Sequence, residues 1–582
     1  MMGQGGAWLR AFIGRSSDKT MQPPPGLVAW LSTPLPYPMS IVLALQHLAV
    51  QSVYFVLPAA AAASVSRDPG EITRFLCLSI LAAALWQTLQ LLTRGPIGSG
   101  YPIPATHTAA LLGAYMMTGR SGAGFGAIGA MVFLTGVAAF ALVFVMRRLR
   151  VFLPNEVAGV VVILIGVALV SLATVQLGLQ PGGTPPHTNA LLTMFGTLGV
   201  MVTLALSGTK AAPFAVLIGS LAGVVLAIAL GQAPANAAEV LAERPWLALP
   251  QPWTPDFAAV QPVALLAYLL ALVAMIATAA GSMVVIQRGS DAGWTRPDAP
   301  PIRRGLLANG IGIAAAGLLG GAAPGPATAA VGLSIATGTL ARRIAWCGVP
   351  LLVIVALCPK FVALFVLTPA PVKAAMLFYV AGFIMAQGCQ LTAARLLDTR
   401  RTLIVAFGLS SGLAVAIAPQ IFAQTLPAIA SPLSFGAVMA FLANLVTLPL
   451  VSRKADLDLP LDARAGRKAS DWLEQLGANW GLKPQTARSA ERAVSELAEL
   501  LLERGAAAVS MSARRSEDRV EIALNWQGEA LPERSASARA EDLLGPLEAQ
   551  ERFAVWMATR EAQSFTQRSS ARGAEARLIF ED

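Results

Sequence analysis

The sequence predicts an all-α polytopic membrane protein that carries a C-terminal α+β domain. Of its 582 residues, 55% are hydrophobic and only 13% are charged, whereas soluble proteins carry about 25% charged residues. Apolar runs near the ~20 residues that cross a bilayer recur from Met39 to Val451. After Leu450 the composition becomes polar, which indicates a separate soluble domain.

Fourteen hydrophobic segments can be placed on the chain, and two of them are short. The loops after even-numbered segments hold most of the basic residues, including Arg147, Arg148, Arg342 and Arg343. This asymmetry predicts a multi-pass protein of a bacterial-type inner membrane, with both termini in the cytoplasm. The segments are 39–63, 72–93, 104–118, 123–146, 153–177, 189–207, 212–231, 262–286, 302–320, 326–340, 344–367, 371–392, 402–422 and 431–451.

Four regions follow from this pattern. Residues 1–37 read as a cytoplasmic N-terminal arm, 38–452 as the membrane domain, 453–468 as a linker and 469–582 as a cytoplasmic regulatory domain. The arm lacks the basic, apolar and small-residue regions of a signal peptide. Within the last region we expect helices near 485–504 and 544–559 and strands in "AAVSMSARR", "RVEIALNWQG" and "EARLIFED".

The net charge of +10 does not indicate nucleic-acid binding. Residues 1–452 hold 23 Lys/Arg and 10 Asp/Glu, and residues 453–582 hold the remaining 19 and 22. The basic excess therefore belongs to the membrane region, where topology explains it. The sequence contains no nucleophile–base pair and no metal-ligand cluster, and its four cysteines lie in apolar segments, so we expect neither an enzyme nor a metal site.

The two short segments point to the functional site. They are introduced by "RGPIGSGYPIPATHTAALLGAY" (94–115) and "GGAAPGPATAAVGLSIATG" (320–338), each a Gly/Pro-interrupted stretch that then turns helical. Each is the third segment in its half of the fourteen, since the halves contain seven segments each. Because seven is odd, the two halves would be inverted relative to each other in the membrane. Interrupted segments at matching positions of inverted halves mark the midplane site of transporters. The alternative is that Gly and Pro merely allow tight helix packing.

The membrane region resembles the nucleobase–ascorbate transporters, the family of uracil, xanthine and uric acid permeases. The resemblance covers about residues 38–452. It is carried by "LQHLAVQSVYFVLPAAAAA" with Gln46 and His47, "GPIGSGYPIP", "NEVAGVVVILIG", "IRRGLLANGIGIAAAGLLGG" and "CPKFVALFVLTPAPVKAAMLFYVAGFIMAQG".

The resemblance implies a 7+7 inverted repeat of fourteen segments with a core and a gate, commonly a homodimer. It places the substrate between the two half-helices and the eighth helix. It also implies transport of a small molecule coupled to a proton or Na+, with no other cofactor and with membrane lipid around the protein.

The polar positions of the family's site are altered here. Ala329 and Ala330 stand where the family has polar recognition residues, and Thr278 and Ser282 replace acidic residues of the eighth helix. All ten carboxylates of residues 1–452 lie outside the predicted spans or at their ends, and Glu156 comes nearest. We therefore expect diverged specificity, for a purine-like or another small polar or anionic solute.

The candidate site residues come from both half-helices and the eighth helix. His107 is a candidate both for ligand contact and for proton coupling, since ionisable groups within membranes are commonly functional; the alternative is a packing histidine. His47 and Glu156 are further coupling candidates, although a structural role fits His47 well. The candidate binding residues are Thr106, His107, Thr108, Ala109, Thr278, Ser282, Thr328, Ala329, Ala330, Gly332 and Ser334.

These observations favour a cation-coupled secondary-active transporter. The alternative is a transporter-derived receptor that signals through its cytoplasmic domain. That domain is similar to the anti-sigma-type histidine-kinase ATPase fold, but Leu500 and Trp526 stand where the resemblance requires a metal-binding Asn and a nucleotide-binding Asp. We expect it to act as a regulatory or dimerisation module, which a cytoplasmic protein could bind.

Overall fold

The structure is a computed structural model of the whole chain. It describes residues 21–149, 155–179, 187–209, 211–232, 234, 236–292, 294, 297–393, 397–425, 431–448, 453–516, 519–532, 546–570 and 573–581. The first twenty residues of the predicted N-terminal arm therefore lie outside the described residues. The chain forms two compact units, the first of residues 1–149, 158–390 and 407–439, and the second of 150–157, 391–406 and 440–582.

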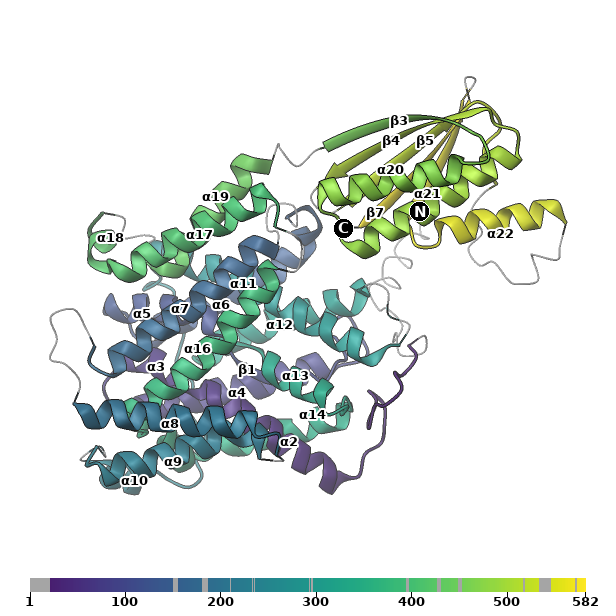
Figure 1. Cartoon of the computed structure of the whole chain (residues 1–582). Helices are drawn as coiled ribbons and strands as arrows, with labels where there is room; N and C mark the ends of the chain where they lie inside the picture. Colours follow the sequence, from purple (N-terminus) through teal and green to yellow (C-terminus); the bar gives the residue numbers. More distant parts are fainter. Residues whose placement is uncertain are drawn as a thin grey trace. The chain divides into compact units, whose positions relative to one another are not determined.

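Apolar helices make up the first unit (Figure 1). Of the described helices, nine are long and apolar enough to cross a membrane, or ten if α14 and α15, bent by 81° at their junction, form one span. The count of fourteen spans stays a prediction. The main helices are α2 (Tyr37–Ser52), α3 (Val56–Ala63), α4 (Pro69–Leu91), α6 (Phe125–Leu149), α7 (Asn155–Gln176), α8 (Thr188–Leu206), α9 (Ala215–Ala229), α11 (Pro262–Ser290), α12 (Ala299–Leu319), α14 (Arg342–Ala356), α15 (Pro359–Val366), α16 (Ala370–Thr392), α17 (Thr399–Ile417) and α19 (Pro432–Thr447). Two short helices, α10 (Ala237–Glu243) and α18 (Pro419–Thr425), and two 3-10 turns, η2 (Val53–Phe55) and η4 (Ala212–Phe214), also belong to this unit.

Local sequence sets where these helices begin, end and pack. Asp68 caps α4, because its carboxylate accepts hydrogen bonds from the backbone N–H groups of Gly70 and Glu71. Gly320 ends α12 with φ of 74°, a left-handed conformation that favours glycine. A Cβ at Gly136 would lie 2.2 Å from the Ala314 nitrogen, so this glycine permits the close packing of α6 on α12.

The two short predicted segments meet as a small antiparallel pair of strands. Strand β1 (Ala105–His107) precedes the 3-10 turn η3 (Ala109–Leu111) and α5 (Leu112–Arg120), and β2 (Pro324–Pro326) precedes α13 (Thr328–Ala336). Thr106 lies opposite Gly325, and His107 lies opposite Pro324. Each interrupted stretch thus runs as extended backbone into a short helix, as the sequence predicts.

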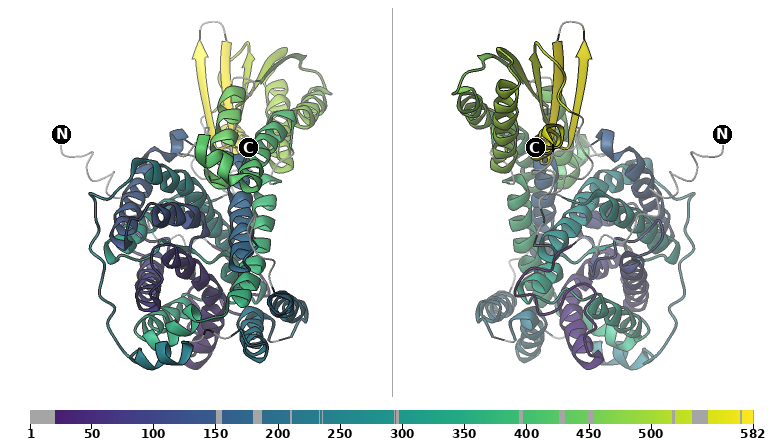
Figure 2. Two further views of the ribbon diagram at one scale, coloured as in Figure 1. Left: turned by 90° about the vertical axis from the view of Figure 1, so that its left-hand side faces the viewer. Right: turned by 90° about the vertical axis from the view of Figure 1, so that its right-hand side faces the viewer.

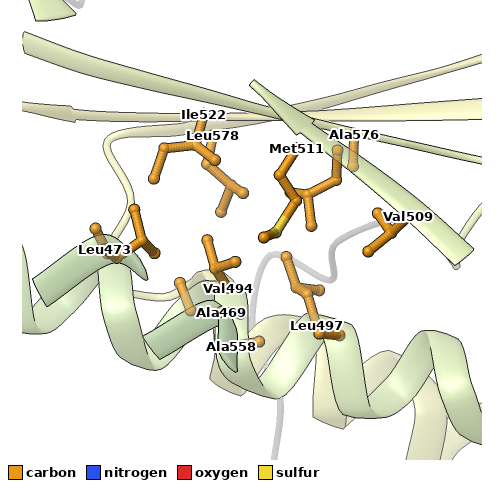
Figure 3. Close-up of a cluster of buried hydrophobic side chains, with 14 of the residues drawn as sticks. Ala469, Leu473, Val494, Leu497, Val509, Met511, Ile522, Ala558, Ala576 and Leu578 are labelled. Atoms are coloured by element: carbon orange, nitrogen blue, oxygen red, sulfur yellow. The ribbon is translucent and has the colours of Figure 1, made fainter. Parts of the chain in front are cut away.

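The second unit contains a five-stranded antiparallel sheet in the order β3-β4-β5-β7-β6 (Figures 1 and 2). Helices α20 and α21 place their apolar faces against it, and Leu473, Val494, Leu497, Met511 and Ile522 meet in the core between helices and sheet (Figure 3). The elements are β3 (Arg453–Pro460), α20 (Ala465–Trp480), α21 (Pro484–Glu503), β4 (Ala508–Ser516), β5 (Arg519–Trp526), α22 (Leu547–Thr559), β6 (Ser564–Ser570) and β7 (Gly573–Glu581).

The predicted linker 453–468 is instead part of this α+β fold. Residues Arg453–Pro460 form the edge strand β3, which pairs with β4 along its whole length, and α20 begins at Ala465. The alternation of apolar and charged residues in "ADLDLP" is the pattern of a half-buried strand. The helix near 485–504 and the strands in "AAVSMSARR" and "RVEIALNWQG" correspond to α21, β4 and β5.

Candidate functional site

A cavity of about 70 Å³ lies where β1 and β2 meet in the first unit. Its walls come from both strands, the turns η2 and η3, the first residue of α13, and helices α7, α11, α12 and α16. That volume holds a few water molecules at about 10–15 Å³ each. The lining residues are Tyr54, Thr106, His107, Thr108, Ala109, Ala110, Val162, Ile165, Met275, Thr278, Asn309, Pro324, Gly325, Pro326, Thr328, Ile384 and Gln387.

Buried amide side chains of α2 and α4 hold β1 in place. The Oε1 atom of Gln87 accepts hydrogen bonds from the backbone N–H of Ala105 at 2.8 Å and from Nε2 of Gln51 at 3.1 Å. Nε2 of Gln51 also donates to the Ala105 carbonyl, and Nε2 of Gln87 donates to the carbonyl of Ala345. The bonds to Ala105 satisfy its backbone N–H and carbonyl groups, which lie in a strand and so have no partner within a helix.

Hydroxyl groups hold the residues that lead into β2. The backbone N–H of Ala322 donates to Oγ of Ser79, and that of Ala323 donates to the hydroxyl of Tyr115, both at 2.8 Å. Backbone hydrogen bonds also join the two interrupted segments, from Thr108 N to the Ala323 carbonyl and from Ala327 N to the Pro104 carbonyl. The cavity therefore has a fixed backbone frame.

Three buried side chains at the cavity carry polar atoms that make no hydrogen bond of good geometry with the described residues. These atoms are Oγ1 of Thr106, both ring nitrogens of His107 and Nδ2 of Asn309; the His107 ring has only an off-geometry contact with the backbone of Ser79. The three residues are 5%, 2% and 1% exposed. Leaving such a group without a partner costs about 1–3 kcal/mol, and nearly all buried polar groups in proteins have one. A bound solute or water in the cavity would supply the missing bonds.

Asn309 is fixed at the cavity by its other end. Its Oδ1 accepts a hydrogen bond from the indole N–H of Trp86 at 2.9 Å, which leaves the amide N–H groups to face a ligand. The ring of His107 is held on one side by Phe55, whose ring centre lies 5.8 Å away in an edge-on arrangement. Both side chains are thus oriented before a ligand binds.

The structure brings together six of the predicted binding residues. Thr106, His107, Thr108, Ala109, Thr278 and Thr328 line the cavity. The Thr108 hydroxyl already accepts from the backbone N–H of Ala110 as a helix cap, and that of Thr278 donates to the Ala274 carbonyl of its own helix. Nε2 of Gln387 donates to the Thr328 hydroxyl at 2.8 Å, linking α16 to the start of α13.

Four other predicted residues lie away from the cavity lining. Ser282 is buried and donates to the Thr278 carbonyl one turn earlier. Ala330 is buried, Gly332 is exposed, and Ser334 bonds to His47 Nε2 at 3.0 Å and to the Ala330 carbonyl. The side chain of Ala329 lies outside the described part of α13.

The two remaining coupling candidates are engaged elsewhere. His47 contacts Ser334 of the second half-helix. Glu156 belongs to the second unit, where its carboxylate lies 3.2 Å from the guanidinium of Arg401 and both side chains are 2% exposed. This buried ion pair gives Glu156 a structural partner, and Glu156 is not among the residues that line the cavity.

Sequence reasoning missed several lining residues. Gln387 gave no signal, because its contact with Thr328 joins residues 59 positions apart. Asn309 is not among the candidate residues from the sequence, because its orientation depends on a bond with Trp86, 223 positions away. The apolar wall formed by Tyr54, Val162 and Ile384 could not be distinguished from ordinary core packing.

The chemistry of the cavity is polar but uncharged. The side chains that line it include no carboxylate and no Lys or Arg. No group of three or more metal-ligating side chains occurs among the described residues. Donors and acceptors face a mainly apolar wall, as is usual in small-molecule sites.

Comparison with known proteins identifies the family. A family model described as "Permease family", for xanthine and uracil permeases, matches residues 39–421. The chain is 26% identical to the uric acid permease PucJ of Bacillus subtilis over 66% of this chain and 86% of the relative. It is also 26% identical to the xanthine permease XanQ of Escherichia coli K12, over 71% and 91%.

Two solved structures are similar in outline. The transmembrane domain of the cyanobacterial bicarbonate transporter BicA matches with a TM-score of 0.46 at 15% identity, over 70% of this chain and 97% of that chain. Murine Slc26a9, an anion transporter, matches with a TM-score of 0.49 at 10% identity, over 76% and 78%. By the family match over most of its length, the chain belongs to the nucleobase–ascorbate transporter family and is a multi-pass membrane permease.

Proposed function

We propose that this permease is a secondary-active, cation-coupled transporter of a neutral, purine-like base, which binds in the cavity at β1 and β2. The observation that carries the proposal is the set of unpartnered polar groups on Thr106, His107 and Asn309. A purine-like base offers ring N–H donors and carbonyl acceptors in one plane. Such a solute can pair with an imidazole, a hydroxyl and an amide at once.

The uncharged lining supports a neutral solute. No carboxylate among the lining residues is available to hold a cation, and no Lys or Arg is available to neutralise an anion. The names of PucJ and XanQ, which match most of this chain, point to oxidised purines as the class to test. Charge movement would then come with the coupling proton or Na+, for which His107 is our candidate.

Uptake into proteoliposomes tests this proposal. We expect radiolabelled xanthine to accumulate in liposomes that contain the full chain when an inward proton or Na+ gradient is imposed, and accumulation to stop when the gradient is dissipated. Ligand-dependent thermal stabilisation without any flux would contradict transport and favour the receptor alternative.

A matched pair of threonine variants tests the site separately. Thr106→Val removes a hydroxyl that has no protein partner, so its KM should rise about fivefold for the loss of one hydrogen bond of about 1 kcal/mol. The control is Thr368→Val, since that hydroxyl is exposed and donates to the Leu364 carbonyl. Equal kinetics for both variants would place the solute elsewhere while leaving transport itself intact.

A further inference from the structure

A second, larger hollow lies on the first unit at the start of two neighbouring helices. It has a volume of about 740 Å³ and lies between α2, α14 and the residues just before α2. It shares no lining residue with the cavity at β1 and β2. The residues that matter for the argument are Tyr37, Ile41, Arg343, Trp346, Pro350 and Ile354, and we call this hollow the α2–α14 groove.

The side chains of the groove change character along its length. Arg342, Trp346, Pro350 and Ile354 line it at intervals of four residues, so they form one stripe along α14. At 1.5 Å per residue the stripe spans about 18 Å, close to the ~15 Å depth of half a bilayer's hydrocarbon core. Charge stands at the helix start, an aromatic ring follows, and apolar side chains continue.

Helix α2 repeats this order beside α14, against which it packs (Figure 1). Tyr37 is its first residue and Ile41 lies one turn further in, and both line the groove. Tyr37 is 64% exposed, Trp346 is 42% and Ile354 is 57%. Tyr and Trp at helix starts beside arginines are typical of the membrane–water boundary.

The Arg343 guanidinium is positioned at the mouth of the groove. Its carbon lies 4.7 Å from the centre of the Tyr37 ring, and one of its nitrogens donates to the Leu35 carbonyl. An arginine has five N–H donors, and the bond to Leu35 uses one of them among the described residues. The groove lining contains two arginines and no acidic side chain. Guanidinium groups bind phosphate through paired hydrogen bonds.

The floor and one wall of the groove are built in advance. Leu35, Ala44 and Ile344 form a small buried cluster, against which Cys347 and Leu351 pack. The chain before α2 is tied to the loop before α14 by backbone hydrogen bonds, from Leu340 N to the Ala29 carbonyl and from Arg342 N to the Leu31 carbonyl. A ligand would therefore enter a hollow that is already shaped.

We propose that the α2–α14 groove binds one anionic phospholipid. Its phosphate lies against Arg343 at the mouth of the groove, and an acyl chain follows Trp346, Pro350 and Ile354 toward the membrane interior. The match in charge, the aromatic boundary and the length of the apolar stripe all belong to a lipid.

Photo-crosslinking on the full chain tests the site. The probe is phosphatidylglycerol with a photoactivatable group on one acyl chain, and phosphatidylcholine with the same group serves as the uncharged comparison. We expect phosphatidylglycerol to label peptides of α14 and α2 more strongly than phosphatidylcholine. Arg343→Gln should lower this labelling about fivefold, the typical contribution of one basic residue at an anionic surface.

Two further variants keep the test decisive. Arg303→Gln is the charge control, since this exposed arginine lies at the start of α12 and outside the groove; it should leave labelling unchanged. Ile354→Trp fills the apolar end without touching the arginines, so it should lower labelling while the protein stays folded. Equal labelling by both lipids would overturn the proposal. So would unchanged labelling of the Arg343→Gln variant, whether or not that variant loses a protein–protein contact such as a dimer.

Discussion

The two interrupted segments share a backbone plan but differ in side-chain chemistry. The first, around β1, carries Thr106, His107 and Thr108, and the second, around β2, runs Pro-Gly-Pro-Ala before its first hydroxyl at Thr328. The first also caps its own helical turn with Thr108, whereas Ala327 cannot cap α13. The first segment supplies more of the polar side chains that line the cavity, whereas the Pro-Gly-Pro stretch of the second supplies a wall without polar side chains.

The difference shows that binding chemistry and backbone geometry are separated in this molecule. Backbone hydrogen bonds in both directions hold the two interrupted segments together, and these bonds do not depend on the side chains of the segments. Proline fixes φ near −65° and removes an N–H donor that would otherwise need a partner in the membrane. Substitutions in the first segment should therefore affect ligand binding, and substitutions in its supports should affect folding.

The largest effect is expected from the support of the first segment. Gln87→Leu removes the acceptor of the Ala105 N–H and of Gln51, and the donor to the Ala345 carbonyl. Unpartnered buried groups should lower the free energy of unfolding by about 3 kcal/mol, measured by thermal unfolding of the purified protein. The neighbouring Thr88→Val is the control, because that hydroxyl only bonds its own helix at Ala84. Equal stability of the two variants would contradict the role of Gln87.

His107→Leu should separate binding from folding. Neither ring nitrogen makes a hydrogen bond of good geometry with the described residues, so the leucine removes at most a weak contact with the Ser79 backbone. Stability without ligand should stay the same or rise, while uptake falls about 30-fold for a loss of about 2 kcal/mol of ligand binding. His187→Leu, at an exposed position before α8, should change neither quantity. A destabilised His107→Leu protein with normal uptake would make His107 a packing residue.

The smallest effect on uptake is expected for Gly325, in the second interrupted segment. A Cβ at Gly325 would approach only Thr108, at 3.8 Å, which is an ordinary contact, so Gly325→Ala should fold normally. The added methyl enters the cavity and should lower uptake about threefold, by less than 1 kcal/mol. Gly332→Ala, on the exposed side of α13 with nothing within 4 Å, should leave uptake unchanged. A stronger effect at Gly332 would extend the site along α13, as the sequence alone suggested.

Local signals in the sequence were sufficient to predict the two interrupted segments and most of the C-terminal α+β fold. Gly and Pro in apolar surroundings marked β1 and β2, and the polar residues beside them included His107. The apolar face of 485–504 gave α21. Contacts between residues distant in sequence were not predictable, and these decide which polar groups remain available to a ligand.

Glu156 and the 453–468 segment illustrate this limit. Glu156 looked available because its partner, Arg401, lies 245 positions further along the chain. The segment 453–468 looked like a linker because an edge strand is recognised mainly by its pairing, here with β4 some fifty residues later. The orientation of the Asn309 amide likewise follows only from its contact with Trp86, whose indole N–H donates to Oδ1 and leaves Nδ2 toward the cavity.

The antiparallel pair of β1 and β2 also bears on how such a permease could acquire a new cargo. Its hydrogen bonds are made by the main chain, and the side chains of Thr106 and His107 make no hydrogen bond of good geometry with the described residues. Exchanges at these two positions would alter recognition at little expense to folding. A gene duplicate could thus explore other solutes through one or two codon changes while its membrane architecture stayed intact.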